Sequence, residues 1–214
     1  MKPHHLTRTP LALAALALTA SSAQGALIAV SGYVYGTNAE SQPQPTSFQG
    51  GAISDVGNVK LTDGVLATGT WNDGTNVGFR NDADNGNPQP RVTLDLGSLY
   101  TVSTVDIWTV TPFLGSDESA SISSSVDGVT FSAPVSVNPI VWTGGFTNTN
   151  LRQGSIDVST LPDGQFYRVD VFDTGQWMMI NEIQLDGVPA VVPEPSAAIL
   201  VALGGLALFR RRRA

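Results

Sequence analysis

Apolar and polar residues alternate along several short segments of this chain, and this alternation restricts the fold more than any other feature. Val92, Leu94 and Leu96 are separated by single polar residues, and similar alternation recurs at 105–108, 120–126, 167–171 and 183–185. A period of two places the apolar side chains on one face of a β-strand. No segment between residues 26 and 190 carries a sustained apolar stripe of helical period. We therefore expect an all-β fold, an antiparallel sandwich or jelly roll.

Turn signals separate these segments. Asp127-Gly128 closes the alternating segment 120–126, and an Asp-Gly pair there predicts a hairpin because Gly accepts a positive φ. The chain also has 22 Gly and 13 Pro, a composition that suits many short strands joined by turns.

The inventory of reactive side chains excludes several mechanisms. The chain has no Cys, and its two His residues, His4 and His5, precede the first apolar segment. If that segment is removed, no thiol or imidazole remains for Ser-His-Asp or Cys-His catalysis or for the common zinc sites. Lys60 is then the only lysine, which disfavours Schiff-base chemistry. Paired carboxylates could act as in a glycosidase, but no such arrangement stands out, and we expect a protein that is not an enzyme.

Residues 1–25 have the pattern of a secretory signal peptide. Lys2 and Arg8 precede the Leu/Ala-rich segment 11–20, and small residues follow it. Cleavage after Ala23, Gly25 or Ala26 is left open. The alternative, a buried N-terminal helix, is disfavoured because nothing acidic offsets the basic start and no capping residues frame the segment.

Residues 191–214 have three consecutive parts. Pro193-Glu194-Pro195 precedes thirteen apolar or glycine residues, 197–209, and four arginines follow. Thirteen helical residues span about 20 Å, less than the roughly 30 Å of a hydrocarbon core, so this short membrane helix must thin the bilayer or recruit neighbours. The arginines stay cytoplasmic, which leaves the middle of the chain facing the periplasm.

This tail resembles the PEP-CTERM sorting signal of Gram-negative bacteria. The resemblance implies recognition and cleavage by an exosortase, and then release to the cell surface or an extracellular polysaccharide matrix. A plain C-terminal membrane anchor is the alternative, and it would leave the Pro-Glu-Pro unexplained. The residues assigned to the signal are Pro193, Glu194, Pro195, Arg210, Arg211, Arg212 and Arg213.

Between the two ends, residues 26–190 form one predicted domain with a strongly negative charge. This part contains five basic and seventeen acidic residues, a net charge of −12. Nucleic-acid binding requires a basic face that neutralises phosphates, so we exclude it. Neutral sugars or divalent cations are better partners for such a surface.

Four blocks of this domain occur in the order found in discoidin domains. They are Leu61-Thr62-Asp63-Gly64 with Trp71, residues 92–97, residues 125–131, and residues 166–169 with Asn181-Glu182-Ile183. Over residues 26–187 the chain resembles the discoidin (factor V/VIII type C) family of the galactose-binding-like superfamily. The resemblance implies an eight-stranded antiparallel jelly roll whose loops at one end bind carbohydrate, lipid head groups or protein.

The resemblance also implies a structural Ca²⁺ site. Asp63 and Glu182 would supply carboxylates, and Thr68 or Thr70 would add an oxygen. The family commonly has Thr where this chain has Gly69. The alternative is that Asp63 caps a turn and Glu182 is a solvated strand residue. A second calcium loop at 81–87 fails the EF-hand spacing and is better explained as a surface turn.

Sugar binding in such domains needs an aromatic face and planar polar groups. The aromatic candidates are Trp142, Phe146 and Trp177, and the polar candidates are Asn72, Asp73, Asn76 and Arg80. Each Trp could instead belong to the core or its rim. Trp71 is expected in the core, and Arg168 is expected to be a cross-strand partner. The leading hypothesis is an exported protein that binds polysaccharide, and the alternative is an acidic structural matrix protein without a specific ligand.

Overall fold

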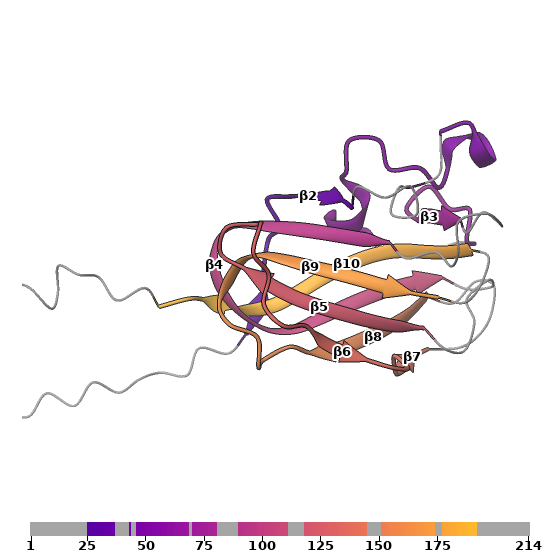
Figure 1. Cartoon of the computed structure of the whole chain (residues 1–214). Helices are drawn as coiled ribbons and strands as arrows, with labels where there is room; N and C mark the ends of the chain where they lie inside the picture. Colours follow the sequence, from indigo (N-terminus) through magenta and orange to yellow (C-terminus); the bar gives the residue numbers. More distant parts are fainter. Residues whose placement is uncertain are drawn as a thin grey trace, which may run out of the picture.

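One long strand, β4 (Arg91–Val110), takes part in both layers of the fold (Figure 1). The computed structural model describes residues 25–36, 43, 46–68, 70–80, 90–110, 118–144, 151–173 and 177–191. The other strands within these ranges are β1 (Ala26–Leu27), β2 (Gly32–Tyr35), β3 (Val77–Arg80), β5 (Ser119–Ser125), β6 (Val135–Val137), β7 (Trp142–Thr143), β8 (Leu151–Asp157), β9 (Gly164–Phe172) and β10 (Trp177–Pro189). Two 3₁₀ helices, η2 (Phe48–Gly51) and η3 (Lys60–Thr62), lie between β2 and β3.

The two halves of β4 belong to different layers. Its first half, residues 91–95, pairs with β2 and β9, and β9 pairs with β5, which pairs with β6. Its second half pairs with β10 over residues 100–109 and with β8 over residues 104–110, and the short strands β1, β3 and β7 extend this layer. A register irregularity between Asp95 and Tyr100 separates the two halves, and every strand pair is antiparallel.

The hydrophobic core lies between these layers. Leu94 and Val169 face it from the first layer, and Ile107 and Leu185 face it from the second, each no more than 1% exposed. The polar residues between them point outward because side chains alternate along a strand. This packing confirms the expectation of an all-β antiparallel sandwich.

Two details differ from the simplest interpretation of the alternating segments. Residues 92–96 and 105–108 belong to one continuous strand, which is interrupted only by the register irregularity between Asp95 and Tyr100, where Gly97 has a positive φ. The hairpin predicted at Asp127-Gly128 does connect two antiparallel strands, β5 and β6, but through the longer segment 126–134. Gly128 has the expected positive φ, at 71°.

The expected signal segment before Gly25 and the C-terminal apolar segment lie outside the described residues. Within the described ranges, no helix combines the length and the apolar character that crossing a membrane requires.

Candidate functional site

The fold brings Asp63 and Glu182, which are far apart in the sequence, to the same cavity. Asp63 directly follows η3, and Glu182 lies on β10, which η3 contacts. The cavity has a volume of about 280 Å³, and Thr62 and Gly64 also line it. Neither Thr68 nor Thr70 is among its lining residues, and the Thr70 hydroxyl donates a hydrogen bond to Asn72.

Glu182 is buried, with only 2% of its surface exposed. Its Oε1 accepts the Gly64 N–H at 3.1 Å, whereas its Oε2 has no hydrogen-bond partner in the described part of the chain. Burial, with a smaller contribution from the negative charge of Asp63, raises the pKa of Glu182 to about 7. The alternative of a solvated strand residue is therefore wrong for Glu182.

Asp63 does cap a turn, because its Oδ1 accepts the Val65 N–H at 2.8 Å. Its carboxylate and the orphaned Oε2 of Glu182 supply the hard oxygen donors that Ca²⁺ prefers. Among the described residues, no three His, Cys, Asp or Glu side chains gather as a metal-binding group. The residues present therefore fit Ca²⁺ only if backbone carbonyl or hydroxyl oxygens complete the coordination shell.

A second feature lies where β3 ends and β10 begins. Arg80 and Trp177 are directly opposite in the β3–β10 ladder, and the Arg80 guanidinium lies 5.4 Å from the centre of the Trp177 ring. Both side chains are only partly buried. The structure thus brings together one aromatic and one planar polar candidate from the predicted sugar site.

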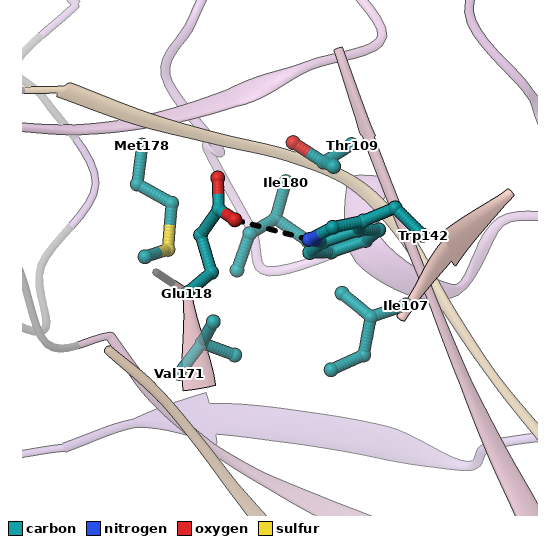
Figure 2. A pocket seen from close by; sticks show the side chains of 7 residues that line it. All are labelled: Ile107, Thr109, Glu118, Trp142, Val171, Met178 and Ile180. Carbon is teal, nitrogen blue, oxygen red and sulfur yellow. Dashed lines mark hydrogen bonds between the residues drawn. The ribbon is translucent and has the colours of Figure 1, made fainter. Parts of the chain in front are cut away.

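Trp142, on β7, packs into the sandwich (Figure 2). Its Nε1 donates to Oε2 of the buried Glu118 at 3.0 Å, and the Arg152 guanidinium lies 4.8 Å from its ring centre. Gly154, opposite Trp142 in the ladder, leaves room for the ring: a Cβ there would lie 3.0 Å from ring atom Cζ3. Trp142 is therefore a half-buried residue held by its neighbours.

Glu118 and Arg152 form a buried ion pair with an N–O distance of 3.4 Å. Burial raises the pKa of Glu118 although Arg152 opposes that shift, and it lowers the pKa of Arg152. Ile107, Met178 and Ile180 line the small apolar space beside the Trp142 indole and the Glu118 carboxylate (Figure 2).

The two described tryptophans of the predicted aromatic set do not share a face. Met178 lines the small cavity beside Trp142. Its neighbour Trp177 points to the opposite side of β10, because successive side chains alternate along a strand. Both occupy the first position of a strand, as expected for loop-to-strand junctions.

The polar candidates 72, 73 and 76 lie in one turn before β3. Asn76 is fully buried, and its Nδ2 donates to the carbonyl oxygens of Thr70 and Trp71. Asp73 accepts the N–H of Thr75, and Asn72 is exposed. Asn76 thus holds the turn together, and only Asn72 and Asp73 present their side chains at its surface.

Trp71 lies outside the core in which it was expected, whereas Arg168 is a cross-strand partner as expected. Trp71 is half-buried and does not belong to the fully buried core. Arg168 lies opposite Thr93 and Ser123, with its guanidinium 4.4 Å from the Phe131 ring centre and 3.7 Å from the Asp170 carboxylate. Phe146, residues 81–87 and the sorting signal Pro193, Glu194, Pro195 and Arg210–Arg213 lie outside the described residues.

Sequence analysis missed the buried charges at the end of the sandwich. Glu118, Arg152 and Asp173 are each no more than 2% exposed. They stand singly in the chain and in no motif, so only their proximity in space marks them. The segment Leu151-Arg152-Gln153 does not alternate between apolar and polar residues, so its pattern gives no indication that Arg152 is buried.

No protein-family model and no curated protein sequence matches the chain. Among solved structures, it is similar to a Streptococcus pneumoniae fucose binding module, with 16% identity, a TM-score of 0.47 and coverage of 75% of this chain and 94% of that one. The C-terminal domain of a Bacteroides fragilis chitobiase gives 12% identity and a TM-score of 0.48, with coverage of 78% and 100%. A family 32 carbohydrate-binding module from C. perfringens in complex with galactose gives 14% identity and a TM-score of 0.46, with coverage of 76% of this chain and 98% of that one. All three TM-scores lie below 0.5, so these modules are structural neighbours and not evidence of what this chain binds.

Proposed function

We propose that this chain is an exported, non-catalytic, discoidin-type jelly-roll module that binds carbohydrate at the end of the sandwich where Arg80 and Trp177 lie. The observation that supports this proposal most is the contact between these two partly exposed side chains. An indole offers a flat apolar surface to the apolar face of a pyranose, and a guanidinium offers several donors in a fixed plane to its hydroxyl groups.

A bound Ca²⁺ would add to the hydrogen bonds that already order this end. Asn181 Oδ1 accepts the Ala67 N–H at 3.0 Å, and Asn181 Nδ2 donates to the Thr75 carbonyl at 3.2 Å. The segment that leads to Arg80 is therefore tied to β10 beside Glu182. A cation held by Asp63 and Glu182, with further oxygen atoms from cavity-lining residues such as Thr62, would add a further link at this place.

The two ends of the chain complete the proposal. Residues 1–25 direct export, and the membrane helix and arginines of the tail hold a precursor that faces the periplasm. An exosortase then processes the chain near Pro193-Glu194-Pro195. The binding module reaches the cell surface or the extracellular matrix, where polysaccharide is its partner.

Binding is tested on a glycan array with the purified protein, in Ca²⁺ and in EDTA. The array includes fucose and galactose, the sugars named for two of the structural neighbours. We expect Trp177→Ala and Arg80→Gln each to weaken binding about tenfold. The control is Arg91→Gln, which removes an exposed guanidinium paired with Asp170 on the other layer and leaves binding unchanged.

The cation is tested separately by thermal denaturation. At free Ca²⁺ about 100 times its Kd, stabilisation is about 2.7 kcal/mol, and we expect Glu182→Gln and Asp63→Asn to lose it. Asp186→Asn, on the same strand as Glu182, keeps it. Equal stability of the wild-type protein in Ca²⁺ and in EDTA would refute the cation site.

An acidic structural matrix protein is the second candidate. The packing of Trp142 against Glu118 and Arg152 favours it, because this indole serves the interior of the sandwich. Absence of any sugar signal under both conditions would support this alternative over carbohydrate binding.

A further inference from the structure

A groove lies on the outer face of the first layer, on the side of β9 that carries Phe166. Its volume is about 510 Å³, and the residues that line it include Val34, Thr93, Asp95, Asp127 and Phe166. The register places Asp95 beside Phe166, and Val34 beside Thr93. The next residue of β9, Tyr167, is fully buried in the core, so Phe166 points away from it.

Phe166 presents a fixed aromatic surface to this groove. The ring packs against Gly128, where an added Cβ would lie 3.4 Å from three ring carbons. Phe166 is nevertheless only partly buried. Val34, at 59% exposed, adds a second apolar surface to the groove.

Two carboxylates in the groove are each held through one oxygen only. Oδ1 of Asp95 accepts the Gly97 N–H at 2.8 Å and a hydrogen bond from Gln165 at 2.9 Å. Oδ1 of Asp127 accepts the N–H groups of Val129 and Thr130 and the Ser125 hydroxyl. Within the described ranges, neither carboxylate has an ion pair, and their Oδ2 atoms make no hydrogen bond.

Arg168, which lies two residues after Phe166 on β9, does not neutralise the charge of these two carboxylates. Arg168, opposite Thr93, pairs with Asp170 at 3.7 Å and stacks on Phe131 at 4.4 Å. The groove therefore combines an aromatic surface with two preoriented negative charges, in a domain whose net charge is −12. Its complement is a ligand with an apolar face and a positive charge.

We propose that this groove binds an amino-sugar unit with a free, protonated amino group, as in a partly de-N-acetylated polysaccharide. The apolar face of the pyranose stacks on Phe166, and its ammonium group approaches Asp95 and Asp127. The Thr93 hydroxyl is available to a sugar hydroxyl. A lysine side chain carries the same charge but has no flat ring face to cover Phe166. This site is separate from the Arg80–Trp177 site and does not depend on it.

The test is calorimetric titration of the full-length chain, in nonionic detergent because residues 197–209 are apolar. The probes are the glucosamine tetramer, its fully N-acetylated form and tetralysine, at about pH 6, where the amines are protonated. We expect the glucosamine tetramer to bind at least about tenfold more tightly than the other two probes.

Asn variants remove the negative charge of the two carboxylates by replacing each Oδ2 with an amide nitrogen. Asp95→Asn and Asp127→Asn keep an Oδ1 acceptor for the existing hydrogen bonds, and we expect each to weaken binding of the glucosamine tetramer about five- to tenfold. Asp157→Asn is the matched control: Oδ1 of Asp157 also accepts a backbone N–H, from Ser159, but this residue lies on the other layer. Binding by this variant should stay within about twofold of wild type.

Several results would overturn the proposal. They are no measurable binding of the glucosamine tetramer, equal affinity for the acetylated form or for tetralysine, and an equal loss in Asp157→Asn. Loss of glucosamine binding in Trp177→Ala would place the ligand at the other site and would also overturn it. If no neutral sugar on the array binds, the proposal for the Arg80–Trp177 site is refuted, but the expected results of the glucosamine titration are unchanged. The two proposals can therefore be refuted independently.

Discussion

At the scale of single residues, Asp55 anchors the segment between β2 and β3. The Tyr33 and Tyr35 hydroxyls both donate to its Oδ2, and the N–H groups of Val59 and Lys60 donate to its Oδ1. Burial alone would raise the pKa of the Asp55 carboxyl, but these four hydrogen bonds bring it below its ordinary value. The ionised carboxylate therefore contributes to stability.

Replacing Asp55 with Asn should lower the free energy of unfolding by about 2–4 kcal/mol, because an amide NH₂ cannot accept two phenol hydroxyls. Tyr35→Phe removes only one of these hydrogen bonds and should cost about 1 kcal/mol. Urea denaturation measures both values.

The Asp55→Asn variant also tests how stability depends on pH. The folded-state pKa of Asp55 lies below its unfolded value of about 3.9, so the stabilisation is present above that pH and is lost as the pH falls through the folded pKa. The difference in Tm between wild type and Asp55→Asn should therefore shrink between about pH 5 and pH 2. A difference that stays constant over this range would contradict this account.

One exposed and one buried ion pair of the sandwich make a matched comparison. Arg91 and Asp170 approach to 2.6 Å, but 47% of the Arg91 side chain is exposed, whereas Arg152 and Glu118 are 3.4 Å apart and buried. Glu118→Gln should cost about 3–5 kcal/mol, because it removes a charge that stabilises a buried guanidinium.

Arg91→Gln should cost less than about 1 kcal/mol despite the shorter distance, because solvent screens the Arg91–Asp170 pair. Chemical denaturation of both variants measures the difference. Equal losses would show that burial does not decide how much each ion pair contributes to stability.

At the scale of the elements, close approach between β10 and β4 restricts Gly187. It follows a register irregularity after Asp186, and an added Cβ would lie 2.3 Å from the Thr101 carbonyl oxygen. Because this contact is with backbone, Gly187→Ala should force the strands apart and lower the free energy of unfolding by about 1–3 kcal/mol.

Gly32 provides the control within a strand, since a Cβ there would meet nothing within 4 Å. Gly32→Ala should change stability by no more than about 0.5–1 kcal/mol and can increase it, because Ala reduces the entropy of the unfolded chain. Similar large losses in both variants would show that strand propensity, and not close approach, is responsible.

At the scale of the whole molecule, export predicts a shortened chain. Mass spectrometry of the protein recovered from the cell surface or the medium should find an N-terminus after Ala23, Gly25 or Ala26 and a C-terminus near Pro193-Glu194-Pro195. If the tail is sorted as proposed, with its arginines on the cytoplasmic side, deleting residues 210–213 should prevent processing and leave a longer, membrane-bound form. Protein retained in the cytosol with Met1 intact would contradict export.

The alternation of residues was enough to predict parts of β4, β5, β9 and β10, because burial of one face requires a period of two, but it did not mark the other strands. Leu94, Ile107 and Val169 were identified as core-facing in this way, and all three are fully buried. The same rule could not reveal that 92–96 and 105–108 form one strand. That continuity depends on β9 and β10 pairing with opposite ends of β4, a long-range contact that leaves no local signal.

The sequence by itself therefore determined the class of fold, the absence of imidazole and thiol chemistry between residues 26 and 190, and the acidic surface, since these follow from composition and short-range periodicity. Only the tertiary structure decided which side chains meet. It placed Glu182 beside Asp63, turned Trp142 inward toward Glu118 while Trp177 points to the other face, and put Phe166 between Asp95 and the segment around Asp127. The physical reason is that strand register, set by the packing of the whole sandwich, decides which distant residues share a face.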